Sequence, residues 1–110
     1  MQNVLYVPDN IHLLIRIKAK KEALDTLLIE IYKTIAPTHK EEGCLEYRVF
    51  HEGRDIFIFG TWKSKMALDM HLILQFHLHL VETVLPELSK KVRIHVSKEL
   101  EPPITALSLG

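Results

Sequence analysis

The chain has 110 residues, a length that fits one domain whose modest core often gains stability by pairing with a second copy. Its 14 basic and 14 acidic residues balance, so it lacks the general positive charge of proteins that bind nucleic acid or anionic membranes. The single cysteine, Cys44, excludes an intramolecular disulfide and any multi-cysteine metal site. We therefore expect a single domain over residues 1–110 that binds no nucleic acid.

The sequence also predicts no contact with a membrane. Its first ten residues lack the basic start and long apolar core of a secretory signal. No apolar run is long enough to span a bilayer, and the lone cysteine fits a reducing compartment. We expect a cytoplasmic protein.

Four segments have the pattern of β-strands. Apolar and polar residues alternate over residues 11–18 and 91–98, which predicts strands with one apolar face. Residues 44–51 and 56–62 flank a short loop that contains a glycine, and they predict a hairpin. Because residues 56–59 are apolar on both faces, we expect the second strand of the hairpin at the centre of the sheet.

Two helical segments separate these strands. Between residues 20 and 40, apolar residues recur at spacings of three and four, and Pro37 is expected to end or kink this helix. We expect Gly43 to supply a left-handed stop after it. The second segment runs from residue 65 to about residue 88, with Ser64 as its N-cap and a break between residues 71 and 77.

The order of these elements, β-α-β-β-α-β, predicts an α+β fold of the ferredoxin-like type. In this fold, helices cover one face of an antiparallel sheet. The core of the domain spans about residues 11–98. The apolar tail, residues 99–110, is expected to dock on the body of the protein or on a partner chain.

The helix-free face of such a sheet would carry too many apolar side chains for a monomer in water. The pattern assigns to it Leu14, either Cys44 and Phe50 or Leu45 and Val49, and then Ile56, Ile58 and Trp62. We therefore expect a symmetric homodimer that packs sheet to sheet. The resulting dimeric α+β barrel could enclose a cavity in each protomer.

Three motifs, in order, resemble the antibiotic biosynthesis monooxygenase family. They are EGCLEY at residues 42–47, WKSKMAL at residues 62–68 and the His-Leu pair at residues 71–72. With the order of the elements, the resemblance covers roughly residues 11–98. It implies a dimeric α+β barrel and a cofactor-independent monooxygenase that acts on a small aromatic or quinol-like compound in the barrel pocket.

The chain departs from this family at two places. Many relatives carry a glutamate two residues before the tryptophan, where this chain has Gly60, and relatives often read Pro-His-Phe at residues 75–77, where it reads Gln-Phe-His. These departures leave open a non-catalytic, dimeric small-ligand-binding protein of the same fold. A haem-degrading monooxygenase is a further alternative, but residues 11–18 lack the asparagine that this branch carries on its first strand.

Six residues are candidates for the site. The resemblance places His71 at the barrel mouth and Trp62 at the end of a barrel strand, and a histidine there is suited to proton transfer. We expect these two to be catalytic, although a capping or solvent-facing His71 and a core Trp62 are open alternatives. The expected substrate-binding residues are His12, Arg16, Tyr47 and His77. Arg16 could instead pair with a carboxylate at the dimer seam, and Tyr47 and His77 could simply be core residues.

The sequence contains seven histidines, but their spacing argues against a metal site within one chain. His71 and His79 are eight residues apart, or about 12 Å along a helix axis. Zinc ligands must converge on one ion at about 2 Å. We expect neither a metal nor a cofactor, and a metal site shared across a dimer is left open.

Overall fold

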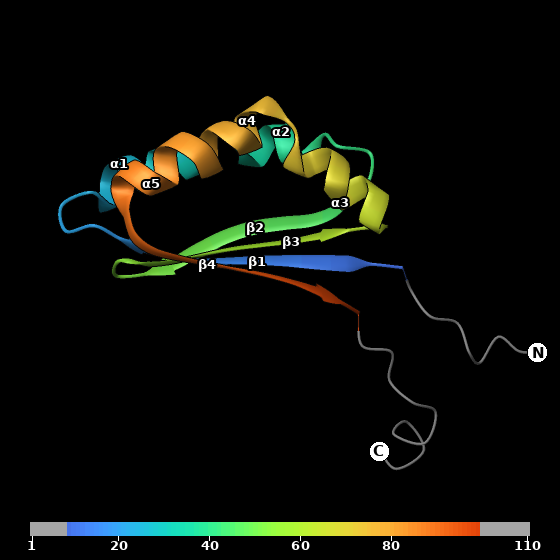
Figure 1. The fold of residues 1–110 in the computed structure, drawn as a ribbon, viewed down its shortest axis with the longest axis horizontal. Helices are drawn as coiled ribbons and strands as arrows, with labels where there is room; N and C mark the ends of the chain where they lie inside the picture. The colour runs from blue at the N-terminus through green and yellow to red at the C-terminus, as the bar shows by residue number, and fades with distance from the viewer. Residues whose placement is uncertain (1–8, 100–110) are drawn as a thin grey trace, which may run out of the picture.

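The computed structural model describes residues 9–99, and helices cover one face of a single sheet (Figure 1). In chain order the elements are β1 (Ile11–Ala19), α1 (Leu24–Tyr32), α2 (Ile35–His39), β2 (Cys44–Glu52), β3 (Asp55–Trp62), α3 (Lys65–Leu72), α4 (Gln75–His79), the π-helical turn η2 (Leu80–Val84), α5 (Leu85–Leu88) and β4 (Ser89–Lys98). The predicted docking of the tail falls on residues 100–110, which lie outside the described residues.

The four strands form an antiparallel sheet in the order β2-β3-β1-β4. This order, with the helices on one face, is the ferredoxin-like α+β fold that the sequence predicts. The predicted central position of β3 is confirmed, since it lies between β2 and β1. The predicted hairpin turns at Gly53, whose φ of +57° favours glycine.

Every second residue of β1 is buried and contributes to the core between the sheet and the helices. Its buried residues face the helices, and they are Ile11, Leu13, Ile15, Ile17 and Ala19. The helices complete the core mainly with Leu27, Ile31, Leu68, Leu80, Val84 and Leu85. The apolar face that the sequence predicts for β1 is therefore the face that the helices cover.

The helix-free face differs from the sequence prediction in β3. The pattern predicts Ile56, Ile58 and Trp62 on this face, but all three are fully buried on the helix side. The prediction is wrong because a strand that is apolar on both faces gives no parity signal, and only pairing with β1 sets which face is buried. The aromatic residues of β3 on the free face are Phe57 and Phe59.

A bulge in β2 separates residues that the pattern groups together. The register of β2 against β3 shifts between Cys44 and Glu46. Cys44 and Val49 consequently both pack against the core, whereas Phe50 and Leu45 are exposed. Neither predicted pair, Cys44 with Phe50 or Leu45 with Val49, shares a face.

The first predicted helix is divided in two. α1 ends at Tyr32 and α2 begins at Ile35, so the break precedes Pro37 by several residues. Pro37 has no N–H to donate to the carbonyl of Lys33, which is where a continuous helix would need one. The kink that Pro37 predicts is thus confirmed, although it lies on the N-terminal side of the proline.

The second helical segment begins and breaks where the sequence predicts. The Ser64 hydroxyl accepts a hydrogen bond from the Ala67 N–H at 3.1 Å, which confirms the N-cap. The helix is interrupted at residues 73 and 74, between α3 and α4. Because of this break, His71 and His77 are both buried, although a straight helix would place them on different faces.

Gly43 is not the left-handed helix stop that the sequence predicts, because its φ is not positive. It instead permits close packing, since a Cβ at position 43 would lie 2.4 Å from the Cβ of Ala67. The Gly43 carbonyl also accepts a hydrogen bond from the Lys63 N–H at 2.9 Å. The loop before β2 is therefore held against the start of α3.

This contact predicts that Gly43→Ala destabilises the protein by about 1–3 kcal/mol through overpacking. In an Ala67→Gly background the same substitution should cost much less, because the opposing methyl group is gone. Ala67→Gly alone should cost about 1 kcal/mol of helix stability. Urea unfolding of all four proteins measures the coupling, and strictly additive costs would contradict the contact.

Candidate functional site

Four of the six candidate residues meet between the end of β3 and the helices. The ring of His71, in the last turn of α3, lies 4.5 Å from that of Trp62 and 4.6 Å from that of His77, measured between centroids. Tyr47 lies 6.2 Å from Trp62 and 6.1 Å from His71. All four side chains are buried. The structure therefore assembles Tyr47, Trp62, His71 and His77 into one cluster.

A carboxylate that the sequence analysis missed joins two of these rings. Glu41, on the connection between α2 and β2, accepts a hydrogen bond from Trp62 Nε1 at 2.9 Å through Oε1. His71 Nδ1 donates to its Oε2 at 2.7 Å. Glu41 stands directly before the first family motif, and this position is the only hint that the sequence offers.

This bridge determines the chemistry of the His71 ring. An ionised carboxylate only accepts hydrogen bonds, so Nδ1 carries the proton that points at Glu41. In the neutral ring, Nε2 then has a free lone pair. Nε2 is fully buried and has no hydrogen-bond partner among residues 9–99. A buried acceptor without a partner is costly, and it is an available base for a ligand that donates a proton.

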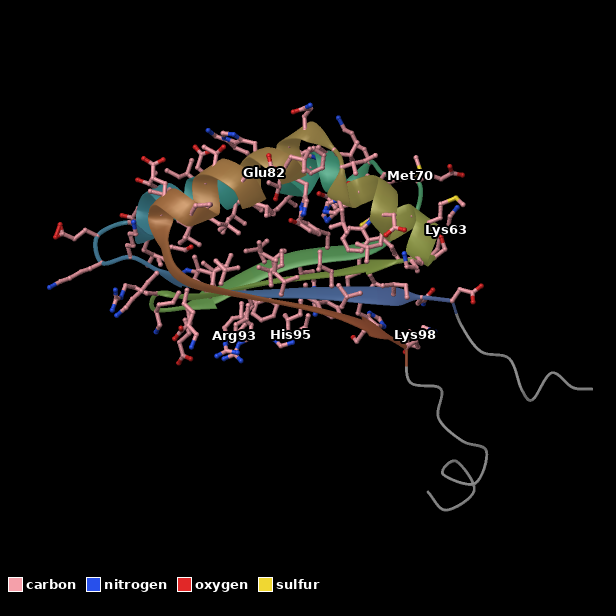
Figure 2. The ribbon with its side chains drawn as sticks, in the orientation of Figure 1. Lys63, Met70, Glu82, Arg93, His95 and Lys98 are labelled. Carbon is pink, nitrogen blue, oxygen red and sulfur yellow. The ribbon has the colours of Figure 1, made fainter. Side chains whose placement is uncertain are left out.

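A cavity of about 410 Å³ adjoins His71 and Glu41. It is lined by Glu41, Glu42, Gly43, Lys63, Ser64, Met66, Ala67, Met70, His71 and Leu74. Lys63 and Met70 lie at the α3 end of the molecule (Figure 2). The volume suits a small molecule, and the two exposed methionines give the wall an adaptable apolar surface.

A sequence model of the antibiotic biosynthesis monooxygenase family matches residues 10–82, about two thirds of the chain. The chain belongs to this family. The match includes the site residues described above and ends within the second helical segment. No curated protein matches the chain.

Several solved structures share the fold. Protein SO0527 from Shewanella oneidensis aligns with a TM-score of 0.81 and 19% identity, over 84% of this chain and 92% of that one. Rv0793 from Mycobacterium tuberculosis aligns with a TM-score of 0.79 and 24% identity, over 84% and 96% of the two chains. A protein described as antibiotic biosynthesis monooxygenase aligns with a TM-score of 0.75 and 19% identity, over 83% and 99%. These likenesses show the fold.

The family resemblance implies a glutamate at position 60, and the structure explains the glycine found there. A Cβ on Gly60 would lie 2.5 Å and 2.6 Å from two ring carbons of Trp62 and 3.1 Å from Tyr47. The Trp62 indole thus occupies the space next to position 60. A side chain at position 60 and this orientation of Trp62 exclude each other.

Tyr47 is a buried neutral phenol in this family member. Burial raises its pKa, and its hydroxyl lies 3.1 Å from the Thr34 hydroxyl. Tyr47 and Val49 face the helices, and the Tyr47 side chain is buried in the core. Its ring still packs beside Trp62 and His71, which makes it part of the wall around these two residues.

The other two candidates, His12 and Arg16, lie on the helix-free face, away from the cluster. His12 contacts the Thr61 hydroxyl at 2.9 Å and Glu99 at 2.6 Å. The Arg16 guanidinium lies over the ring of Phe57, 5.9 Å from its centroid. Arg93 and His95 of the neighbouring β4 also point away from the helices (Figure 2). One protomer therefore does not bring His12 or Arg16 to His71.

Two further features concern metals and membranes. Within residues 9–99, no three His, Cys, Asp or Glu side chains gather closely enough to hold a metal ion. None of the helices in this part of the chain is long and apolar enough to cross a membrane.

His77 predicts a pH-dependent loss of stability. Burial, with a smaller effect of the charge on His71, lowers the pKa of His77 from 6.5 to about 4. Between these values the unfolded chain binds a proton that the folded protein excludes, so stability falls as the pH drops from 6.5 to 4, by at most about 3 kcal/mol. Urea unfolding across this range should show a shallower decline for His77→Gln.

His79→Gln is the matched control for this experiment. His79 lies on the same helix and is exposed, so its replacement should leave the decline as steep as in the wild type. Parallel pH profiles for His77→Gln and the wild type would contradict the role of His77.

Proposed function

We propose that this protein is a cofactor-independent monooxygenase, an oxidoreductase that acts on a small aromatic or quinol-like compound bound beside His71. The observation that carries the proposal is the buried Nε2 of His71, which has no hydrogen-bond partner among the described residues. The family, the adjoining cavity and the aromatic wall support it.

The proposed reaction begins with a proton transfer. Nε2 of His71 accepts the proton of a substrate hydroxyl, and the resulting phenolate gives up an electron to dioxygen more readily than the phenol does. A quinol and one dioxygen give a hydroxyquinone and one water, so all the electrons that reduce dioxygen come from the substrate. The surrounding rings of Trp62 and Tyr47 limit the access of water to the anion.

Binding requires a local rearrangement, because Nε2 has no exposed surface in the structure. His71 is among the residues that line the cavity, and the wall also contains Met66, Met70 and Leu74. Methionine side chains are flexible and adapt to flat ligands at small cost. We expect the substrate to enter from this cavity and to complete the hydrogen bonding of His71.

The monooxygenase proposal predicts dioxygen uptake with some members of a panel of quinols and phenols. His71→Gln should lower kcat by about 10²- to 10⁴-fold, because the general base is lost. Trp62→Phe should lower it less, because one wall remains aromatic. The exposed His79→Gln is the control and should keep wild-type rates.

Three other results of these measurements would contradict the monooxygenase proposal or favour an alternative. Equal rates in the wild type, His71→Gln and Trp62→Phe would remove both residues from the mechanism. Saturable binding without dioxygen uptake would favour the non-catalytic ligand-binding alternative. A Soret shift on addition of haemin would favour the haem-degrading alternative.

We also propose that two copies associate through the helix-free face, as a cytoplasmic homodimer. This face presents Phe50 and Phe57, stacked with centroids 5.5 Å apart, together with Phe59 and Leu14. Apolar side chains on an open sheet face are unfavourable in water, and a symmetric partner covers such a face in the commonest oligomers. In the dimer, His12 and Arg16 would lie at the interface between the two sheets.

The dimer proposal predicts that Phe59→Lys yields a folded monomer, because it places a charge at the centre of the interface on β3. Sedimentation or light scattering measures the mass, and circular dichroism checks the fold. Ile73→Lys is the control, since Ile73 is 70% exposed on the helical side and should keep the wild-type mass. A monomeric wild type would refute the dimer.

A further inference from the structure

We propose that Glu41 is the positioning residue of this site, which holds His71 in its Nδ1–H form and orients the Trp62 indole. This role rests on the proposed function, because orienting His71 matters for catalysis only if that residue acts as the base. It also identifies the source of the carboxylate that position 60 cannot supply.

The first argument is geometric. Glu41 places one oxygen on each ring, with Oε1 at 2.9 Å from Trp62 Nε1 and Oε2 at 2.7 Å from His71 Nδ1. Its side chain is only 14% exposed, and that of His71 is fully buried. A carboxylate that accepts from a histidine N–H sets both the tautomer and the ring orientation, as such second partners do for catalytic histidines.

The second argument concerns what holds Glu41 itself. Its N–H donates to the Thr38 carbonyl and its carbonyl accepts from the Cys44 N–H, each at 3.1 Å. Gly43 then lets the same connection press against Ala67 at the start of α3. The carboxylate is therefore fixed by the backbone on both sides and does not depend on a flexible surface loop.

The third argument concerns the carboxylate position. With Gly60, the Trp62 ring lies back over position 60 while its Nε1 reaches Glu41. Any side chain at position 60 would collide with this ring. Glycine at position 60 and a carboxylate at position 41 are consequently parts of one arrangement, in which the acid approaches the rings from the α2–β2 connection.

The test is the tautomer of His71, read from the ¹⁵N chemical shifts of its ring at alkaline pH. The peaks are assigned by their loss in His71→Gln. In the wild type, Nδ1 should be protonated and Nε2 unprotonated. Glu41→Gln replaces the carboxylate by an amide that can donate to Nδ1, so the proton should move to Nε2. Glu41→Asp keeps the charge and should keep the wild-type tautomer.

Glu42→Gln is the matched control, because the neighbouring Glu42 side chain is 94% exposed and lies 3.8 Å from Lys63. It should leave the ring spectrum unchanged. An unprotonated Nδ1 in the wild type, or the same tautomer in Glu41→Gln, would overturn the proposal. The wild-type measurement decides even if a variant fails to fold.

Kinetics with an accepted quinol give the second readout. Glu41→Gln should lower kcat by about 10- to 100-fold with little change in KM, since it misorients the base without removing the cavity. Glu41→Asp should recover part of the rate, and Glu82→Gln, at an exposed glutamate outside the cavity lining, should retain all of it. The tautomer measurement needs no substrate, so it can support the role of Glu41 even if the protein is not a monooxygenase.

Discussion

One largely buried carboxylate, that of Glu41, links three elements that form the candidate site. Glu41 follows α2, Trp62 ends β3 and His71 closes α3, and two hydrogen bonds to one side chain connect all three. The bridge is strong because at least one partner is charged and water is largely excluded. It leaves Nε2 of His71 without a hydrogen-bond partner among the described residues. This free acceptor is the atom of the site that can take a proton from a ligand.

The two faces of the sheet carry different kinds of side chain. The helix side buries aliphatic side chains and holds the ring cluster, whereas the free side carries Phe57, Phe59 and the cations Arg16 and Arg93. Successive strand residues point to opposite faces. Phe59 therefore lies on the free face and Gly60 on the helix side, although they are neighbours in the sequence. A change of register by one residue would exchange these surfaces.

Two glycines, Gly43 and Gly60, allow the close contacts of the site because they have no side chain. Gly43 brings the connection that carries Glu41 within contact of α3, and Gly60 leaves room for the Trp62 indole. The departure from the family pattern at position 60 therefore does not by itself mean the loss of a carboxylate. In this chain the carboxylate that contacts the rings comes from position 41.

The sequence by itself determined the order of the elements, the central position of β3, the Ser64 cap, the helix break and the family, because these follow from local patterns and motifs. Only the tertiary structure decided which face of β3 is buried and that His12 and Arg16 lie apart from His71. It also decided that Glu41 belongs to the site. Strand register and contacts across 30 residues of chain depend on packing in space, which no local pattern encodes.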